Sequence, residues 1–391
     1  MQPLNSSFLK DKKVILICHF SSTAFMQHLE EFLIRNKVGK LLSIIHPLHP
    51  KEAHVGSHFY ICKDGEIKKK YQIGVLIMPE LFHYMKDSIL NLWWIASSKE
   101  KWDLCIAANN LNAFSAIWLR KLGLIKKVVF YTVDFVPNRF NNKILNNFYH
   151  WVEKFAVTHA DETWILSPRV REGRRKYLGL DKIFDQKQIL VPEGVWIDRI
   201  NRKQKNGDQR TAIFAGHLKE RMGVQFVIRA IPLVLKKIPD FKFIIIGKGD
   251  YKEKLEKIVK KLKLEKHVMF KGYIKDHQQV EELIASCAVG VAPYTKDESN
   301  LTFYADPAKT KLYLGAGIPV VMTDTFYNAY DIEKAGAGIV ARENEEKIAR
   351  AIITILENKK RWQLYKKNAL KFAKQFDHNL IFINNLKRIF L

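Results

Sequence analysis

The sequence predicts an α/β protein with two doubly wound parallel sheets. Short apolar runs rich in β-branched residues alternate with amphipathic helical segments along the whole chain, the pattern of parallel strands with helical crossovers. The 391 residues suit two domains with full cores. Residues 201–210, NRKQKNGDQR, contain no apolar side chain, and the alternation restarts directly after them. Two α/β halves joined by a polar linker are therefore expected.

The first half is predicted from six apolar runs and the helical segments between them. A hairpin is expected where Lys63-Asp64-Gly65 joins residues 59–62 to 71–78, because Asp-Gly favours a tight turn. The predicted parallel strands are 14–18, 41–45, 103–108, 128–132, 163–166 and 189–191. The predicted helices are 25–36, 81–97, 114–122, 145–159 and 169–177.

The second half repeats the pattern after the polar segment. Its predicted strands are 212–215, 241–246, 268–270, 288–292, 320–322 and 338–340. Its predicted helices are 223–237, 251–262, 280–285, a short one that starts at Asp306, 345–356 and 361–376. We expect an N-terminal domain at 1–195, a linker at 196–210 and a C-terminal domain at 211–375. The last helix, 376–391, is expected to pack back on the N-terminal domain.

The short helix that starts at Asp306 carries an electrostatic conflict. Asp306 suits the N-cap, and Pro307 suits the first helical position. Lys309 and Lys311 then put positive charge where the helix macrodipole disfavours it. The two cations are therefore predicted to face an anion, and a helix start beside lysines is a natural phosphate site. Solvated lysines on an ordinary connection are the alternative.

Composition limits the partners and the compartment. The net charge of +25 fits nucleic acid, an anionic membrane surface or phosphorylated substrates, although a lysine-rich composition alone could produce it. The scattered cysteines form no Cys-x-x-Cys pair, so a reduced, cytoplasmic location is expected. No apolar run approaches the ~20 residues that span a bilayer. Any membrane contact is thus expected at the surface, through the basic helix 169–177 or through one of Trp93 and Trp94.

Several chemistries lack their motifs. The first strand ends in His19-Phe20-Ser21-Ser22 rather than in the glycine-rich turn of dinucleotide-binding folds. There is no Walker-type loop, no nucleophile elbow and no Asp-x-Asp pair that would clamp a metal. Four histidines at 46, 49, 54 and 58 fall in a predicted loop, where two prolines prevent a common helix face. No metal site is predicted there.

Five stretches together resemble the retaining glycosyltransferases of the GT-B fold, particularly glycosyltransferase family 4. They resemble the interdomain junction, the donor phosphate loop, two donor-domain strands and the Ala-Gly-x-Pro-Val segment of that family. These stretches are residues 191–198, 214–223, 243–249, 270–273 and 315–321. The resemblance implies two Rossmann-like domains and a nucleotide diphosphate sugar as donor, bound by the C-terminal half. The N-terminal half agrees mainly in layout, as expected where acceptors differ.

Two departures from the family pattern concern charge. The positions of the two family glutamates are occupied by Tyr304 and Leu312, whereas Pro307 and Lys309 match a Pro-x-Lys variant. The phosphate-loop Arg and Lys of the family correspond to His217 and Met222. Lys219 and Arg221 lie close to these positions and could take over the cationic role.

The resemblance implies a set of site residues. Arg221 and Lys309 are expected to neutralise the leaving phosphate, and Asp134 to face the acceptor sugar, although Asp134 could equally cap a loop. The backbone amides of Gly216 and of the Asp306 helix start are expected to hold the pyrophosphate. The remaining expected donor residues are His217, Lys219, Gly247, Lys248, Gly249, Tyr273, Tyr304 and Lys311. Ser21, Ser22 and Tyr131 are expected on the acceptor side.

The expected activity is transfer of a sugar from a nucleotide sugar to a hydroxyl, in polysaccharide or glycolipid assembly, with retention and without metal or cofactor. The expected partners are the donor, a glycan or lipid-linked acceptor and an anionic membrane surface, but no nucleic acid. With both glutamates absent, an inactive partner protein of the same fold is the first alternative. A nucleotide-sugar epimerase is the second, and it would need acid/base carboxylates and histidines.

Overall fold

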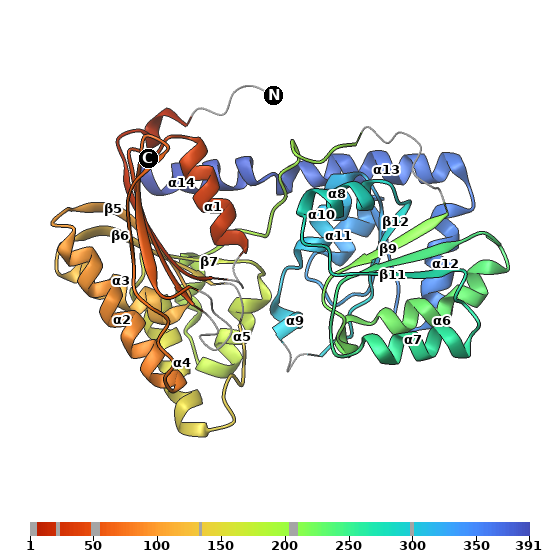
Figure 1. The fold of residues 1–391 in the computed structure, drawn as a ribbon, viewed down its shortest axis with the longest axis horizontal. Helices are drawn as coiled ribbons and strands as arrows, with labels where there is room; N and C mark the ends of the chain where they lie inside the picture. The colour runs from red at the N-terminus through yellow and green to blue at the C-terminus, as the bar shows by residue number, and fades with distance from the viewer. Residues whose placement is uncertain (1–5, 21–23, 48–54, 133–134, 203–209, 298–300) are drawn as a thin grey trace. The chain divides into compact units, whose positions relative to one another are not determined.

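The computed structural model describes residues 6–20, 24–47, 55–132, 135–202, 210–297 and 301–391. These residues form two compact units (Figure 1). The N-terminal unit contains the chain up to Pro192 together with His378–Leu391, and the C-terminal unit is Glu193–Asp377. Val195 and Ile200, near or within the predicted linker, belong to the hydrophobic core of the C-terminal unit. The predicted helix at 376–391 is α14, His378–Phe390, which belongs to the N-terminal unit.

The sheet of the N-terminal unit has the order β4-β3-β2-β1-β5-β6-β7-β8 among the described residues. In this order, neighbouring strands from β2 to β8 pair in parallel, whereas the β4–β3 and β3–β2 pairs are antiparallel. The strands are β1 Lys13–Phe20, β2 Lys40–Pro47, β3 His58–Lys63, β4 Glu66–Gln72, β5 Trp102–Ala108, β6 Ile125–Thr132, β7 Glu162–Ile165 and β8 Gln188–Leu190. The helices are α1 Ala24–Arg35, α2 Glu80–Ser97, α3 Asn110–Lys121, α4 Lys143–His159, α5 Arg169–Leu178 and α14, with 3-10 turns at Ser7–Leu9 and Lys182–Lys187.

The predicted hairpin is present, but its second strand was placed wrongly. Asp64 and Gly65 have φ of 56° and 88°, so both turn residues adopt the left-handed conformation of a tight two-residue turn. The second strand is β4, which starts at Glu66, and every residue in it is exposed. Because β4 is an edge strand without a buried face, it lacks the alternating pattern by which strands are recognised.

The C-terminal unit contains a parallel sheet with the order β11-β10-β9-β12-β13-β14. Its strands are β9 Thr211–Ala215, β10 Lys242–Ile246, β11 Val268–Gly272, β12 Val289–Ala292, β13 Val320–Met322 and β14 Gly338–Val340. Its helices are α6 Val224–Leu235, α7 Lys252–Lys261, α8 His277–Ala285, α9 Leu301–Tyr304, α10 Ala308–Ala316, α11 Ala329–Lys334, α12 Glu345–Leu356 and α13 Lys359–Ala373, with 3-10 turns at Glu220–Met222 and Lys374–Phe376. The two predicted parallel sheets are thus confirmed.

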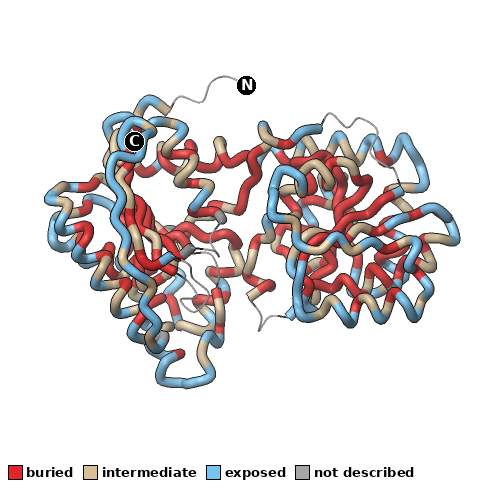
Figure 2. Tube along the Cα trace, in the orientation of Figure 1, coloured by how far each residue is buried: buried red, intermediate tan, exposed pale blue. Residues whose placement is uncertain are grey.

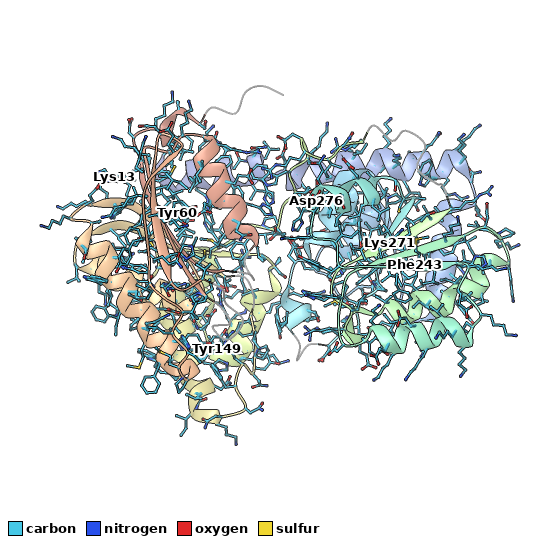
Figure 3. All side chains as sticks on the ribbon, in the orientation of Figure 1. Lys13, Tyr60, Tyr149, Phe243, Lys271 and Asp276 are labelled. Carbon is cyan, nitrogen blue, oxygen red and sulfur yellow. The ribbon has the colours of Figure 1, made fainter. Side chains whose placement is uncertain are left out.

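The strand order of the C-terminal unit reverses between β9 and β12, where ligands bind in doubly wound sheets. Helices cover both sheets, whose strands are largely buried except at the β3–β4 edge (Figure 2). Phe243 on β10 lies in the core of the C-terminal unit, whereas Asp276 caps α8 near the surface (Figure 3). Among the described residues, no helix has both the length and the apolar character needed to cross a membrane.

Candidate functional site

Two glycines end neighbouring strands at the centre of the C-terminal sheet. Gly216 follows β9 with φ 147°, and Gly247 follows β10 with φ 135°, a conformation that side chains disfavour. A Cβ on Gly247 would overlap the carbonyl oxygen of Gly216, so the two loops approach as closely as backbones can. The amide of Gly216 donates to the carbonyl of Ile246 at 3.0 Å. The prediction that this amide binds pyrophosphate is therefore wrong, because the sheet ladder already uses it.

Lys309, from the first turn of α10, lies at the switch point of the sheet. Its Nζ is 3.9 Å from the ring centroid of Phe214 on β9 and 4.8 Å from that of Tyr294, which follows β12. It also lies 2.7 Å from the place that a Cβ on Gly216 would occupy. No carboxylate among the described residues forms an ion pair with this ammonium. Burial lowers the pKa of Lys309 to about 7. The residue as a whole is half-buried, so a ligand can reach it.

Further cations surround this point. The pKa of His217 is lowered by burial and then by the charges of Lys219, Lys309, Lys248 and Arg221. Since all four act on one imidazole, they converge on the same region. Nε of Arg221 is buried and has no hydrogen-bond acceptor among the residues that the structure describes. An anion bound at this point would therefore meet several positive groups.

Buried polar contacts fix the two rings that hold Lys309. The hydroxyls of Thr323 and Thr325 donate to the carbonyl oxygen of Tyr294 at 2.6 and 2.9 Å. The amide of Ala215, next to Phe214, donates to the hydroxyl of Tyr313 at 2.9 Å. None of these supporting residues was singled out from the sequence, because their neighbours are brought close only by the fold.

Replacing Tyr313 by phenylalanine should lower the free energy of unfolding of the C-terminal unit by about 1–3 kcal/mol. The change leaves the half-buried Ala215 amide without its acceptor and alters little else. Thermal or urea unfolding followed by circular dichroism measures the effect. Equal stability of the variant and the unchanged protein would show that the hydroxyl does not hold β9.

The helix at Asp306 begins later than predicted. The N-cap of α10 is Pro307, without a side-chain cap bond, so the prediction of Asp306 as N-cap is wrong. The Asp306 carboxylate instead accepts from the amide of Glu193 at 3.0 Å and pairs with the ammonium of Lys311. Both side chains of this pair are fully buried. Lys311 therefore has a structural partner inside the unit, and the prediction that it faces a bound anion is corrected.

The other expected donor residues lie in different surroundings. Lys248 lies over the exposed ring of Tyr273, with Nζ 5.1 Å from the centroid. Gly249 is held close to the backbone of Leu218, where a Cβ would overlap the carbonyl. Tyr304 is buried, and Leu312 packs against the core.

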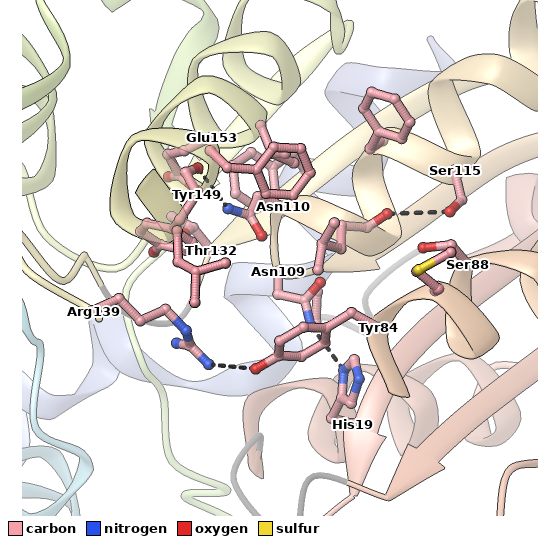
Figure 4. Close-up of a pocket in the computed structure, with 18 of the residues that line it drawn as sticks. His19, Tyr84, Ser88, Asn109, Asn110, Ser115, Thr132, Arg139, Tyr149 and Glu153 are labelled. Atoms are coloured by element: carbon pink, nitrogen blue, oxygen red, sulfur yellow. Dashed lines mark hydrogen bonds between the residues drawn. The ribbon is translucent and has the colours of Figure 1, made fainter. Parts of the chain in front are cut away.

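The N-terminal unit contains a cavity of about 570 Å³ between α2, α3, α4 and the ends of β1, β5 and β6 (Figure 4). His19 and Asn109 lie at its floor. The Asn109 side-chain oxygen accepts from the amide of Asn112 at 3.0 Å, so its Nδ2 donates to His19 Nδ1 at 2.8 Å. Asn109 has φ of 63°, which is strained for a side chain other than glycine. Such a strained polar residue in a cavity is typical of a functional site.

A buried polar network supports the floor from behind. His19 Nε2 lies 3.3 Å from Asp87 Oδ2, and His46 Nδ1 lies 3.1 Å from Asp87 Oδ1. Lys86 Nζ also pairs with this carboxylate at 2.9 Å. Burial alone would raise the pKa of Asp87, but the hydrogen bonds from His19 and His46 hold it below its usual range. His46 thus belongs to buried strand β2, not to the predicted loop, while His49 and His54 lie outside the described residues.

Among the residues that the structure describes, no predicted acceptor-side residue lines this cavity. Tyr131 is buried on the other face of β6, with its ring edge against Phe25 and Trp164, so its prediction as a sugar-facing residue is corrected. Its neighbours Phe130 and Thr132 line the cavity instead, because adjacent strand residues face opposite sides. Ser21, Ser22 and Asp134 lie outside the described residues. His19 and Asn109 were not predicted as site residues, although each directly follows a predicted strand.

The basic helix α5 has partners of its own. Arg174 is fully buried and donates to Glu153 and Gln188. Arg171 donates to the carbonyl of Gln188, and Arg175 pairs with Asp185. These contacts engage three of the cations that were expected to attract a membrane, so α5 is a weaker electrostatic surface than its sequence indicates.

The C-terminal half of the chain matches the model of a known protein family. Residues 197–372 match the model of the family glycosyl transferases group 1. Over these residues the chain is similar to that family. The matched segment contains Lys309, Gly216 and the cations around His217.

The fold agrees with solved structures over nearly the whole chain. Sucrose-phosphate synthase from Thermosynechococcus elongatus has a TM-score of 0.72 at 15% identity, covering 97% of this chain and 98% of that one. A glycosyltransferase from Rickettsia africae has a TM-score of 0.70 at 14% identity, covering 97% and 98%. Anabaena HepE, solved with UDP, has a TM-score of 0.65 at 14% identity, covering 96% and 99%. The fold is that of the GT-B glycosyltransferases, as predicted.

Curated relatives match shorter segments. The chain is 28% identical to a poly(glycerol-phosphate) alpha-glucosyltransferase of Bacillus subtilis over 222 residues, 56% of this chain and 28% of that protein. It is 29% identical to a GDP-mannose-dependent alpha-(1-6)-phosphatidylinositol monomannoside mannosyltransferase of Mycolicibacterium smegmatis over 122 residues, 31% of this chain and 27% of the relative. The chain thus spans less than a third of the length of these two relatives.

Proposed function

We propose that the protein is a glycosyltransferase that uses a nucleoside diphosphate sugar as donor and a hydroxyl as acceptor. The observation that carries this proposal is the Lys309 ammonium, which is held on two aromatic rings at the sheet switch point with no carboxylate partner among the described residues. A buried cation without a counterion is costly, so a bound anion is its natural partner. The match of the C-terminal segment to the model of the group 1 family supports a nucleotide sugar as that anion.

In this proposal the chain contributes electrostatic stabilisation at the leaving group. Negative charge develops on the diphosphate as the bond between sugar and phosphate breaks, and Lys309 and Arg221 lie where they can offset it. Preorganised charges of this kind usually provide the largest share of such catalysis. Because these side chains supply the positive charge, we expect no requirement for a divalent metal. Transfer with retention rests on family resemblance and on relatives whose names specify alpha linkages.

The acceptor is assigned to the N-terminal unit, whose cavity contains polar groups at the strand ends. Relatives named for glucosyl and mannosyl transfer favour a hexose as the sugar and a cell-surface polymer or glycolipid as the product. We infer a cytoplasmic reaction, because the four cysteines are buried and none of them forms a disulfide, as in a reducing compartment.

An inactive partner protein is the second candidate. The observation that favours it is that Tyr304 is buried and Leu312 is apolar, so neither position offers the carboxylate found in the family. Such a protein would keep the fold and the anion site without turnover.

A donor panel tests both candidates. The purified chain is titrated calorimetrically with UDP, GDP and ADP, and then incubated with the matching sugar nucleotides and a membrane lipid extract, with and without EDTA. One nucleotide should bind with a dissociation constant below about 1 mM, and its sugar donor should release nucleoside diphosphate equally well in EDTA. Binding without release, under every acceptor condition, would favour the inactive partner. The absence of any nucleotide binding would overturn both.

A further inference from the structure

The cavity of the N-terminal unit changes from polar to apolar between its floor and its rim. Its floor is formed by buried groups at the strand ends, including His19, Asn110 and Thr132. Figure 4 shows these groups together with Asn109 and Arg139 on one side of the cavity. The rim consists of apolar side chains that remain exposed, among them Ile89 (61% exposed) and Phe148 (48%). The cavity therefore suits a ligand with one polar end and a long apolar part.

The apolar rim continues onto the outer face of α2, α3 and α4. Trp93 is 55% exposed, whereas its neighbour Trp94 is buried against Phe59, so only one of the two tryptophans belongs to the core. The other large apolar side chains that these helices expose are Phe82, Met85, Leu92, Trp118, Ile144, Leu145 and Trp151. Leu122, directly after α3, is exposed as well. A continuous exposed apolar face of this kind marks an interaction site.

On the same helices, the described carboxylates are buried and several lysines are exposed. The described carboxylates of α2, α3 and α4 are Asp87 and Glu153, and both are buried. Lys121, Lys143 and Lys154 are exposed, and Lys121 Nζ lies 4.4 Å from the ring centroid of Trp118. The face therefore presents apolar groups and cations without a described exposed carboxylate. This combination complements an anionic phospholipid surface, to which nearby cations are attracted.

We propose that this face docks on an anionic bilayer and that the cavity takes the hydrocarbon chain of a membrane lipid acceptor. The lipid's polar group reaches the floor at His19 and Asn109, and its chain leaves past Ile89 and Phe148 toward the bilayer. The assignment of this lipid as acceptor rests on the proposed function. Docking and chain binding do not, because they depend on the N-terminal unit alone.

Vesicle flotation tests docking with the full chain. Vesicles of 70% phosphatidylcholine and 30% phosphatidylglycerol should carry the protein, and vesicles of phosphatidylcholine alone should carry at least tenfold less. The double variant Ile89→Ser/Phe148→Ser should float at least tenfold less than the unchanged protein. Leu364→Ser, at an equally exposed leucine of α13, is the matched control and should float normally. Equal flotation of the double variant, equal flotation on neutral vesicles, or a dimer that the double variant disperses would each overturn docking on lipid.

A second variant tests the cavity itself. Ser88 lines the cavity between the rim and the floor, so Ser88→Trp should fill it and leave the outer apolar face unchanged. The variant should float normally but should bind pyrene-labelled phosphatidylglycerol, presented in detergent micelles, at least fivefold more weakly. Unchanged binding of this probe would place the chain outside the cavity. UDP or GDP titration of the same variants separates this test from the proposed function, since nucleotide binding should be unaltered in all of them.

Discussion

Replacing Lys309 by alanine should weaken nucleoside diphosphate binding and lower turnover by at least tenfold. The ammonium is the buried cation nearest the switch point, and a charge-assisted hydrogen bond to phosphate contributes about 1.5–3 kcal/mol. The rings of Phe214 and Tyr294 hold it in place before the ligand arrives, so little reorganisation is needed on binding. Calorimetric titration and a nucleotide-release assay measure the two effects.

The same lysine predicts a pH dependence of binding. With a pKa of about 7 in the free protein, Lys309 loses its charge as the pH rises through neutrality. A bound diphosphate favours the charged form and raises the pKa, so binding above pH 7 must take up a proton. Affinity should therefore fall between pH 7.5 and 9. Titrations in two buffers with different ionisation enthalpies should show nearly one proton taken up at pH 8.5.

Two variants control this prediction. Lys309→Arg keeps a permanent charge that can stack on the same rings, so its nucleotide affinity should be almost independent of pH in this range. Lys366 lies 5.0 Å over Trp362 in the same unit, and burial also lowers its pKa, but it is not part of the cation cluster. Lys366→Ala should bind nucleotide normally. A wild-type affinity that stays constant up to pH 9 would remove Lys309 from the binding charge.

Breaking the buried pair of Asp306 and Lys311 should destabilise the C-terminal unit by about 3–5 kcal/mol. Both side chains are fully buried, so removing either one leaves an uncompensated charge in the interior. We expect Asp306→Asn and Lys311→Met to show this loss separately. The double variant should recover most of it, because asparagine still accepts from the Glu193 amide and neither member of the pair is then charged.

Calorimetric unfolding of the three variants measures this coupling. Nucleotide binding by the double variant separates the structural role from a ligand-binding role, since it should stay within threefold of the unchanged protein. Strong loss of nucleotide binding in a stable double variant would show that Lys311 belongs to the donor site and not only to a structural pair.

The fold could be predicted because it depends on patterns that are local in the chain. Runs such as residues 243–246 and 289–292 are apolar enough to be buried strands, and the helices between them are periodic. The same patterns fail for β4, whose residues are all exposed. Strand ends can also be recognised in the sequence, so the glycines at 216 and 247 could be predicted to follow strands.

The sequence predicts the site only as precisely as it predicts where a helix begins and which face of a strand each residue occupies. Lys309 and Lys311 have the same local signal, but they are two residues apart on α10. One therefore faces the switch point and the other the interior. Likewise Tyr131 and Thr132 are adjacent, and the alternation of β6 decides which of them lines the cavity. Partners distant in the chain, such as Tyr313 for Ala215, leave no local pattern at all.

The glycine at position 216 leaves room for the Lys309 ammonium. The Lys309 ammonium lies 2.7 Å from where the first carbon of any side chain at position 216 would stand, so a methyl group there would displace this cation from its present place. The two positions, 93 residues apart, should therefore vary together during evolution. A descendant that keeps the ammonium in this place is expected to keep glycine at 216, where φ of 147° gives a second preference for glycine.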